Sequence, residues 1–142
     1  MPTYRHVLLT TDFTDSGKKC LKKAQIIAED YKAKLTVLHV VEPLPAYAMS
    51  YMGTLNLEEE MMNQAQISLE SLMKDLTFSG ADSLIELGSV KSSILKVAEE
   101  KSVDLIIVGS HGRHGLERLI GSTAAAVLQG AKCDVLVVHT YD

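Results

Sequence analysis

Hydrophobic positions follow two patterns that alternate along the chain, and the alternation predicts strands and helices in turn. Mainly apolar runs, typical of strands buried on both faces, occur at Leu35–Val41 and Val103–Val108. Shorter segments at Tyr4–Thr11, Ser83–Leu87 and Val135–His139 also favour strands. Strands that alternate with helices predict an α/β fold, with a parallel sheet covered by helices on both faces.

Between these strands, apolar residues recur at spacings of three and four, the period of a helix that packs on a core. We expect helices to begin at Asp15-Ser16, at Asn56 and after Ser89, and a short helix over Ser122–Gln129. Asp15-Ser16 and Ser89 are the expected N-caps, and Ser79-Gly80 is the expected stop of the second helix. The predicted inner face of the third helix consists of Val90, Ile94, Val97 and Ala98.

Residues 42–56 interrupt the alternation. Pro43 and Pro45 exclude a regular helix or a central strand there. Connections of this length are uncommon in compact domains and often form lids or binding loops. The apolar content of the segment favours a binding role over an insertion without one; these side chains are Leu44, Tyr47, Met49, Tyr51, Met52 and Leu55.

Composition and charge narrow the class of protein. The 142 residues fit a single domain spanning 1–142, and 46% hydrophobic with 23% charged residues is an ordinary globular balance. A net charge of −4 gives no general attraction to nucleic acid. No run is long enough for a signal peptide or a membrane span, so we expect no membrane association. Cys20 and Cys133 lie far apart and are expected to be buried free thiols, which favours the cytoplasm.

The segment Gly109–Thr123 carries most of the candidate chemistry. It follows a buried strand and leads into a helix, and its glycines let the backbone approach a ligand closely. Successive backbone N–H groups, together with a helix start at Ser122 and Thr123, favour a phosphate group. Arg113 can add a charge-assisted contact. The alternative is a glycine-rich turn followed by an ordinary helix cap.

Asp12 is the second candidate, since it ends the first strand after Thr10 and Thr11. In parallel sheets, ligands bind at the carboxyl ends of strands where the strand order reverses. If the first and fourth strands are neighbours there, Asp12 faces the glycine segment, and its carboxylate can accept hydrogen bonds from a ribose or an adenine. The alternative is that Asp12 caps the following helix, and the two roles are compatible.

These motifs together resemble the universal stress protein family of the UspA type, over essentially the whole chain. The matching segments are Asp12 at a strand end, Leu38-His39-Val40, Asp104 to Gly112, Gly121-Ser122-Thr123, and Cys133 to Val138. The resemblance implies a Rossmann-like, doubly wound, five-stranded parallel sheet with strand order 3-2-1-4-5. It also implies a homodimer paired through the last strand, near Val135–His139.

Some family members bind ATP or AMP, and these resemble the pattern G-x2-G-x9-G-[S/T]. Gly109, Gly112, Gly121 and Ser122 match it, although only eight residues separate Gly112 from Gly121, one fewer than in the pattern. By resemblance we expect a cytoplasmic stress-response sensor or regulatory module that binds ATP or AMP, with or without Mg. Asp12 would contact the nucleoside and Val40 the adenine. The full expected site is Thr10, Thr11, Asp12, Val40, Gly109, Ser110, His111, Gly112, Arg113, Gly121, Ser122 and Thr123.

The sequence also permits other hypotheses for the function. A slow ATP hydrolase would need His111, His114 or Glu117 to position water. A dimer that binds no nucleotide would act through residues 42–56 and partner surfaces. The spacing of His111 and His114 alone is a weak zinc signal, because a zinc site needs more ligands in fixed geometry. We expect no catalytic residue and no metal site.

Overall fold

The computed structural model describes residues 4–47, 57–110 and 121–139, and within them the chain forms one parallel sheet. The strand order is β3-β2-β1-β4-β5, which confirms the predicted α/β class and topology. The strands are β1 (His6–Thr10), β2 (Lys34–Val41), β3 (Ala81–Leu87), β4 (Leu105–Gly109) and β5 (Asp134–Val138). Each lies within about two residues of the segment predicted for it.

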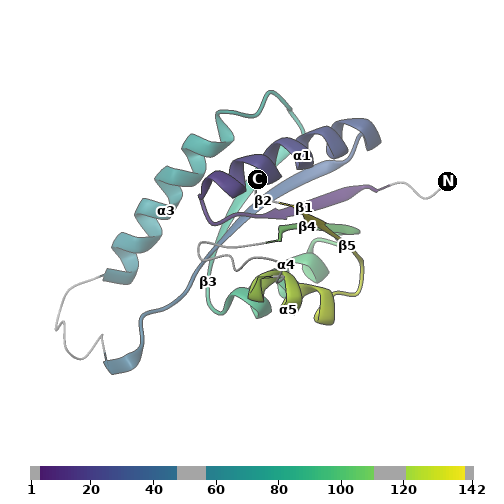
Figure 1. Cartoon of the computed structure of the whole chain (residues 1–142). Helices are drawn as coiled ribbons and strands as arrows, with labels where there is room; N and C mark the ends of the chain where they lie inside the picture. The colour runs from purple at the N-terminus through teal and green to yellow at the C-terminus, as the bar shows by residue number, and fades with distance from the viewer. Residues whose placement is uncertain (1–3, 48–56, 111–120, 140–142) are drawn as a thin grey trace.

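Helices cover both faces of the sheet, as the alternation predicts (Figure 1). They are α1 (Asp15–Tyr31), α3 (Leu57–Met73), α4 (Val90–Glu100) and α5 (Ser122–Gly130). Helices α1 and α3 pack on one face, and α4 and α5 pack on the other. The inner side of α4 is close to the predicted set, since Ile94, Val97 and Ala98 are buried and Val90 is half-buried.

The core has two layers because neighbouring residues of a strand point to opposite faces. Val7 and Leu9 of β1 face α1 and α3, whereas Leu8 faces α4 and α5. All three side chains are 0% exposed. The central strand β1 is therefore fixed on both sides, and the turn that follows it starts from a rigid position.

Two helix boundaries differ from the prediction. The N-cap of α1 is Thr14 rather than Asp15-Ser16, since the Thr14 hydroxyl accepts the hydrogen bond of the Gly17 N–H. Helix α3 ends at Met73, several residues before Ser79-Gly80. Short-range hydrogen bonds then turn the chain, and Leu76 packs on the core from this turn. Leu76 therefore keeps its apolar contact without extending the helix.

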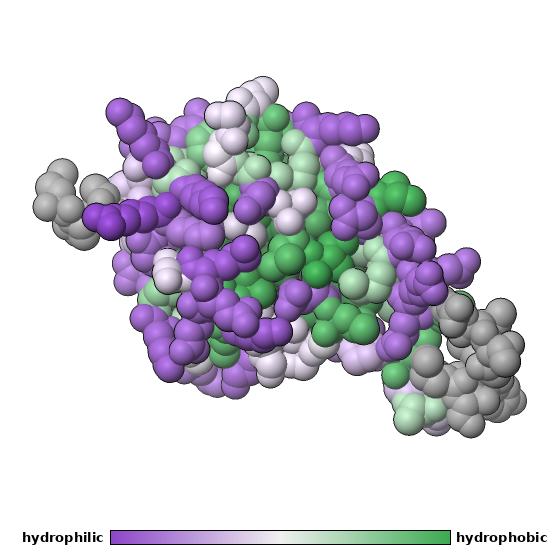
Figure 2. All heavy atoms as spheres, turned by 180° about the vertical axis from the view of Figure 1, so that it is seen from behind, coloured by the Kyte–Doolittle hydropathy of each residue, from purple (hydrophilic) through white to green (hydrophobic). Residues whose placement is uncertain are grey.

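The edge strand β3 lies on the side of the molecule shown in Figure 2, where apolar side chains gather in the middle of the face and polar ones surround them. Leu87, at the end of β3, is 47% exposed. Within the described ranges, no helix is both long enough and apolar enough to cross a membrane.

Candidate functional site

The reversal of strand order lies between β1 and β4. The two strands pair in parallel, with Leu9 beside Ile107. Two residues beyond that pair, the chain reaches Thr11 on one strand and Gly109 on the other, so Asp12 and Ser110 leave the sheet at the same edge. The expected neighbours are thus brought together at the switch point, where parallel sheets bind ligands.

The turn from β1 into α1 is built around Asp12. Its Oδ1 accepts hydrogen bonds from the backbone N–H of Thr14 at 3.1 Å and from the Thr14 hydroxyl at 2.6 Å. Phe13, between them, has a positive φ of 66°, a conformation that a residue with a side chain adopts at a cost of about 1–3 kcal/mol. Asp12 therefore shapes the turn, but the alternative that it caps the following helix is wrong, because Thr14 is the N-cap of α1.

Three residues that sequence reasoning did not assign to the site hold this turn in place. Nδ1 of His39 lies 2.7 Å from the carbonyl oxygen of Thr11, and the His39 ring packs against Phe13 with centroids 4.2 Å apart. Gly17 lies so close that a Cβ there would be 2.8 Å from the Thr11 Oγ1. Gly17 lies close to Asp12 in the sequence and could have been found from that position. The contact between His39 and Phe13, in contrast, forms only in the folded chain.

The connection from β4 to α5 is fixed at both of its ends. Ser110 is buried, its N–H donates to the carbonyl of Val138 at 2.8 Å, and its own carbonyl accepts from the Gly121 N–H at 2.6 Å. Gly121 is the N-cap of α5, and within the described residues no side chain caps the first N–H groups of this helix. Helix N-termini of this kind attract anions through these groups and the helix dipole.

The remaining expected residues divide into two groups. Thr10 ends β1, Ser122 and Thr123 begin α5, and half-buried Val40 lies near the end of β2 on the face covered by α4 and α5. His111, Gly112 and Arg113 lie outside the described residues, as do His114 and Glu117. In the part of the chain that is described, no three His, Cys, Asp or Glu side chains gather to hold a metal ion.

Cys20, a buried thiol of α1, has a shifted pKa. Burial, with a smaller contribution from the negative charge of Asp12, raises the pKa of the Cys20 thiol to about 11. Cys20 is 2% exposed, on the buried side of α1. The expectation of a buried free thiol is confirmed for Cys20, while Cys133 is free but only half-buried.

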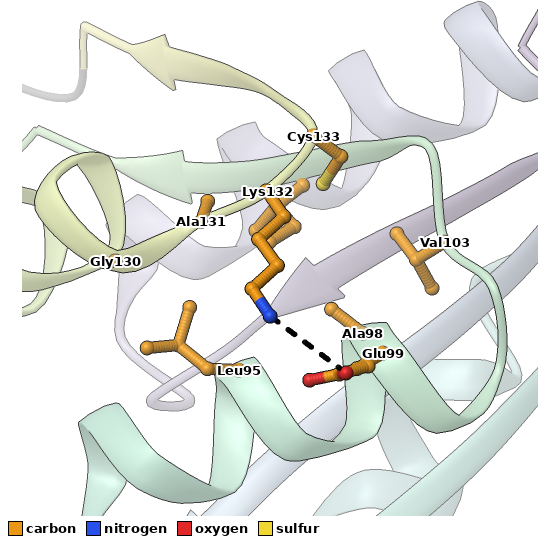
Figure 3. Close-up of a pocket in the computed structure, with 9 residues that line it drawn as sticks. Leu95, Ala98, Glu99, Val103, Gly130, Ala131, Lys132 and Cys133 are labelled. Atoms are coloured by element: carbon orange, nitrogen blue, oxygen red, sulfur yellow. Dashed lines mark ion pairs between the residues drawn. The ribbon is translucent and has the colours of Figure 1, made fainter.

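A cavity elsewhere in the molecule does not compete with this site. It has a volume of about 90 Å³ and lies between α4 and the segment that joins α5 to β5 (Figure 3). Lys132 reaches from that segment to Glu99 on α4, with Nζ 3.9 Å from Oε1. The cavity is too small for a nucleotide, since sites for ligands of that size measure roughly 300–1,000 Å³.

Comparison with known sequences identifies the family of this chain. A family model described as the universal stress protein family matches residues 3–139. The chain is 36% identical to universal stress protein A homolog 2 of Coxiella burnetii, over 98% of this chain and 97% of the relative. It is also 36% identical to homolog 1 of the same organism, over 95% and 96% of the two chains.

Solved structures agree with this similarity. The fold superposes on hypothetical protein MJ0577 with a TM-score of 0.85, 26% identity and 99% coverage of both chains. A universal stress protein in complex with cAMP superposes with a TM-score of 0.67 and 27% identity, over 99% of this chain and 100% of the other.

Proposed function

This chain belongs to the universal stress protein family, and we propose that it binds an adenine nucleotide, ATP or AMP, at the carboxyl ends of β1 and β4. In this proposal the protein is a stress-response sensor or regulatory module whose occupancy follows the nucleotide pool. The observation that carries the proposal is the start of α5, which has no side-chain cap and adjoins the switch point beside Asp12.

The described residues fit a nucleotide in three ways. The first N–H groups of α5, with the hydroxyls of Ser122 and Thr123, suit phosphate oxygens. Oδ1 of Asp12 holds the turn, which leaves its second carboxylate oxygen for a ribose hydroxyl or an amino group of the base. Half-buried Val40 offers an apolar contact for adenine. The structural neighbour in complex with cAMP supports adenine nucleotides as the ligand class.

Isothermal titration calorimetry with ATP, AMP and cAMP, with and without Mg²⁺, tests the proposal on the whole chain. We expect binding of ATP or AMP, and no heat at millimolar nucleotide would overturn it. Mass spectrometry of ligand released from the purified protein provides an independent measurement.

Asp12→Asn separates the proposed contact from the structural one. The Asn side-chain oxygen can still accept from Thr14, so the turn and the folded state are kept. We expect roughly tenfold weaker nucleotide binding from loss of the charged acceptor, equivalent to about 1.4 kcal/mol. Unchanged affinity would remove Asp12 from the proposed site.

A second variant tests the phosphate contacts at the start of α5. The double variant Ser122→Ala with Thr123→Ala keeps the backbone N–H groups and removes the hydroxyls, so we expect ATP affinity to fall by about tenfold. Ser71→Ala, an exposed position on α3, is the matched control and should bind nucleotide normally.

The proposal includes a homodimer and a cytoplasmic location. Strand β5 is at the edge of the sheet, and Val135, Leu136 and Val137 are only half-buried in one chain. Apolar edge strands are normally paired or covered. Analytical ultracentrifugation should give a dimer, and Val135→Lys should shift it to monomer. The two free thiols favour a reducing compartment.

A further inference from the structure

A chain of hydrogen bonds crosses three strands near their amino-terminal ends. We call this side of the sheet the amino edge and the opposite side, which carries the proposed nucleotide site, the carboxyl edge. Nε2 of His6 on β1 lies 2.7 Å from the Oγ1 of Thr36 on β2, and this hydroxyl donates to Oδ1 of Asp82 on β3 at 2.7 Å. On its other side, Nδ1 of His6 lies 3.1 Å from the carbonyl oxygen of Lys101. We call His6, Thr36 and Asp82 the cross-strand relay.

All three contacts of the relay can be hydrogen bonds at the same time only when His6 carries an added proton. Each of its three contacts needs one hydrogen between two electronegative atoms. A neutral imidazole and the Thr36 hydroxyl supply two, and an ionised carboxylate supplies none. With a protonated His6 all three contacts are made, since Nδ1–H donates to Lys101, Nε2–H donates to Thr36, and Thr36 donates to Asp82.

The relay also tolerates a neutral His6, because its third member, Asp82, is exposed and can bond to water instead of Thr36. His6 is 8% exposed and Thr36 is 0% exposed, whereas Asp82 is exposed. With a neutral His6, the Thr36 hydroxyl can turn and donate to Nε2, and water can solvate the Asp82 carboxylate. The hydroxyl of Thr36 thus has two orientations, one for each protonation state of His6.

The groups around His6 change its pKa in both directions. Burial lowers the pKa of His6, and the positive charges of Lys34 and Lys101 lower it further. The hydrogen bond to the Lys101 carbonyl and the negative charge of Asp82 raise it. The carboxylate of Asp104 faces the same strand end but accepts hydrogen bonds from the backbone N–H groups of Arg5 and His6, so it is used in holding β1.

We propose that the cross-strand relay is an acid-tolerance device, in which Asp82 accepts the reversed Thr36 hydroxyl and so lets the buried His6 take up a proton while the sheet stays folded. The direction of the pH dependence follows from the linkage between protonation and folding. A buried histidine that resists protonation makes the fold less stable as the pH falls below the unfolded value near 6.5. Asp82 reduces this loss, because it favours the protonated state.

Titration of His6 by NMR on the full chain tests the relay. In Asp82→Asn we expect the midpoint of His6 to move to lower pH by about one unit, because the charged acceptor is lost. Thr36→Val should move it in the same direction. The double variant should shift it no further than the larger single change, because both substitutions break one connected chain.

Unfolding in urea gives the second measurement. At about pH 7.5, Asp82→Asn should match the unmodified protein, and at about pH 5 it should be the less stable of the two. Glu86→Gln removes a carboxylate from the same face of β3 and is the control, with an unchanged His6 midpoint. An unchanged midpoint in Asp82→Asn, or an equal loss of stability at both pH values, would overturn the proposal.

Discussion

At the amino edge of the sheet, polar side chains from three strands bond to one another in a row, whereas at the carboxyl edge the described side-chain contacts hold the turn between β1 and α1. His6, Thr36 and Asp82 connect three strands, and Asp104 joins the start of β4 to the start of β1. On the opposite edge, Asp12 bonds to Thr14, two residues ahead, and the His39 ring of β2 lies within hydrogen-bonding distance of the Thr11 carbonyl oxygen.

This difference has a consequence for function. Side chains that join strands stabilise the sheet and have few hydrogen-bonding atoms left for a ligand. The side chains at the carboxyl edge hold the turn after β1, and the N-cap residue Gly121 gives the start of α5 no side-chain hydrogen bond. We therefore expect the amino edge to contribute mainly to stability and the carboxyl edge to carry the proposed nucleotide site.

The largest effect concerns the two thiols, one near each edge. Raising the pKa of Cys20 from 9.0 to about 11 lowers its thiolate fraction below pH 9 by roughly a hundredfold. Native Cys20 should therefore react with iodoacetamide at least that much more slowly than in the unfolded chain. Burial also raises the pKa of Cys133, but that residue is half-buried and should react faster than Cys20. Peptide mass spectrometry gives both rates.

The pH dependence of Cys20 has a definite sign. Because its folded pKa lies above the unfolded value, the neutral thiol favours the folded state below about pH 9, and this contribution is lost as the pH rises towards 11. Cys20→Ser should weaken the loss of stability in that range. Equal alkylation rates in native and unfolded protein would mean that the carboxyl edge is open down to α1.

The next effect concerns the amino edge. Asp104→Ala removes the acceptor of the Arg5 and His6 N–H groups and should lower the free energy of unfolding by about 2 kcal/mol. Nucleotide affinity should stay unchanged, because the proposed site lies at the other edge. Asp104→Asn keeps one oxygen acceptor and should lose less. A large fall in affinity would show that the two edges are coupled.

A smaller effect is expected for Thr14→Ala at the carboxyl edge. The variant loses the N-cap of α1 and the hydroxyl that bonds Asp12, which should cost about 1 kcal/mol in urea unfolding. Nucleotide affinity should fall as well, because Asp12 is no longer held. Thr14→Ser restores the hydroxyl and should recover both properties. A stability loss without any change in affinity would separate the turn from the site.

The smallest effect concerns Lys132→Ala. The side chains of Lys132 and Glu99 are 84% and 73% exposed, so their ion pair should contribute less than about 0.5 kcal/mol. Thermal unfolding of this variant beside Asp104→Ala compares an exposed pair with a partly buried acceptor at the same edge. A loss as large as that of Asp104→Ala would contradict the view that strand-joining contacts dominate there.

The sequence was sufficient for the parts of the fold that depend on local patterns. The apolar runs of β2 and β4 and the spacing of α4 predict those elements, and Ser89 is the N-cap that was expected. The α1 cap was placed too late because two acidic or hydroxyl residues follow Thr14 directly. The choice among them depends on the Asp12 turn, which no propensity describes.

Contacts between distant residues could not be predicted in the same way. Thr36 lies 30 positions from His6 and 46 from Asp82, and only the register of β1, β2 and β3 brings them together. His39 likewise reaches Thr11 through a neighbouring strand. Asp12 was predicted as a site residue from its place at a strand end, because a parallel sheet collects all its carboxyl ends at one edge. Ser110 was expected from the glycine-rich segment and the resemblance to the family.

The hydrogen bond from the Gly121 N–H to the Ser110 carbonyl oxygen joins the end of β4 to the start of α5 and closes the connection between them. Closure entropy grows only with the logarithm of the length of a connection, so adding or removing one residue changes the free energy by roughly 0.1 kcal/mol. Neither β4 nor α5 has to move when the length changes. The spacing between Gly112 and Gly121 is therefore free to vary among related chains without altering the sheet.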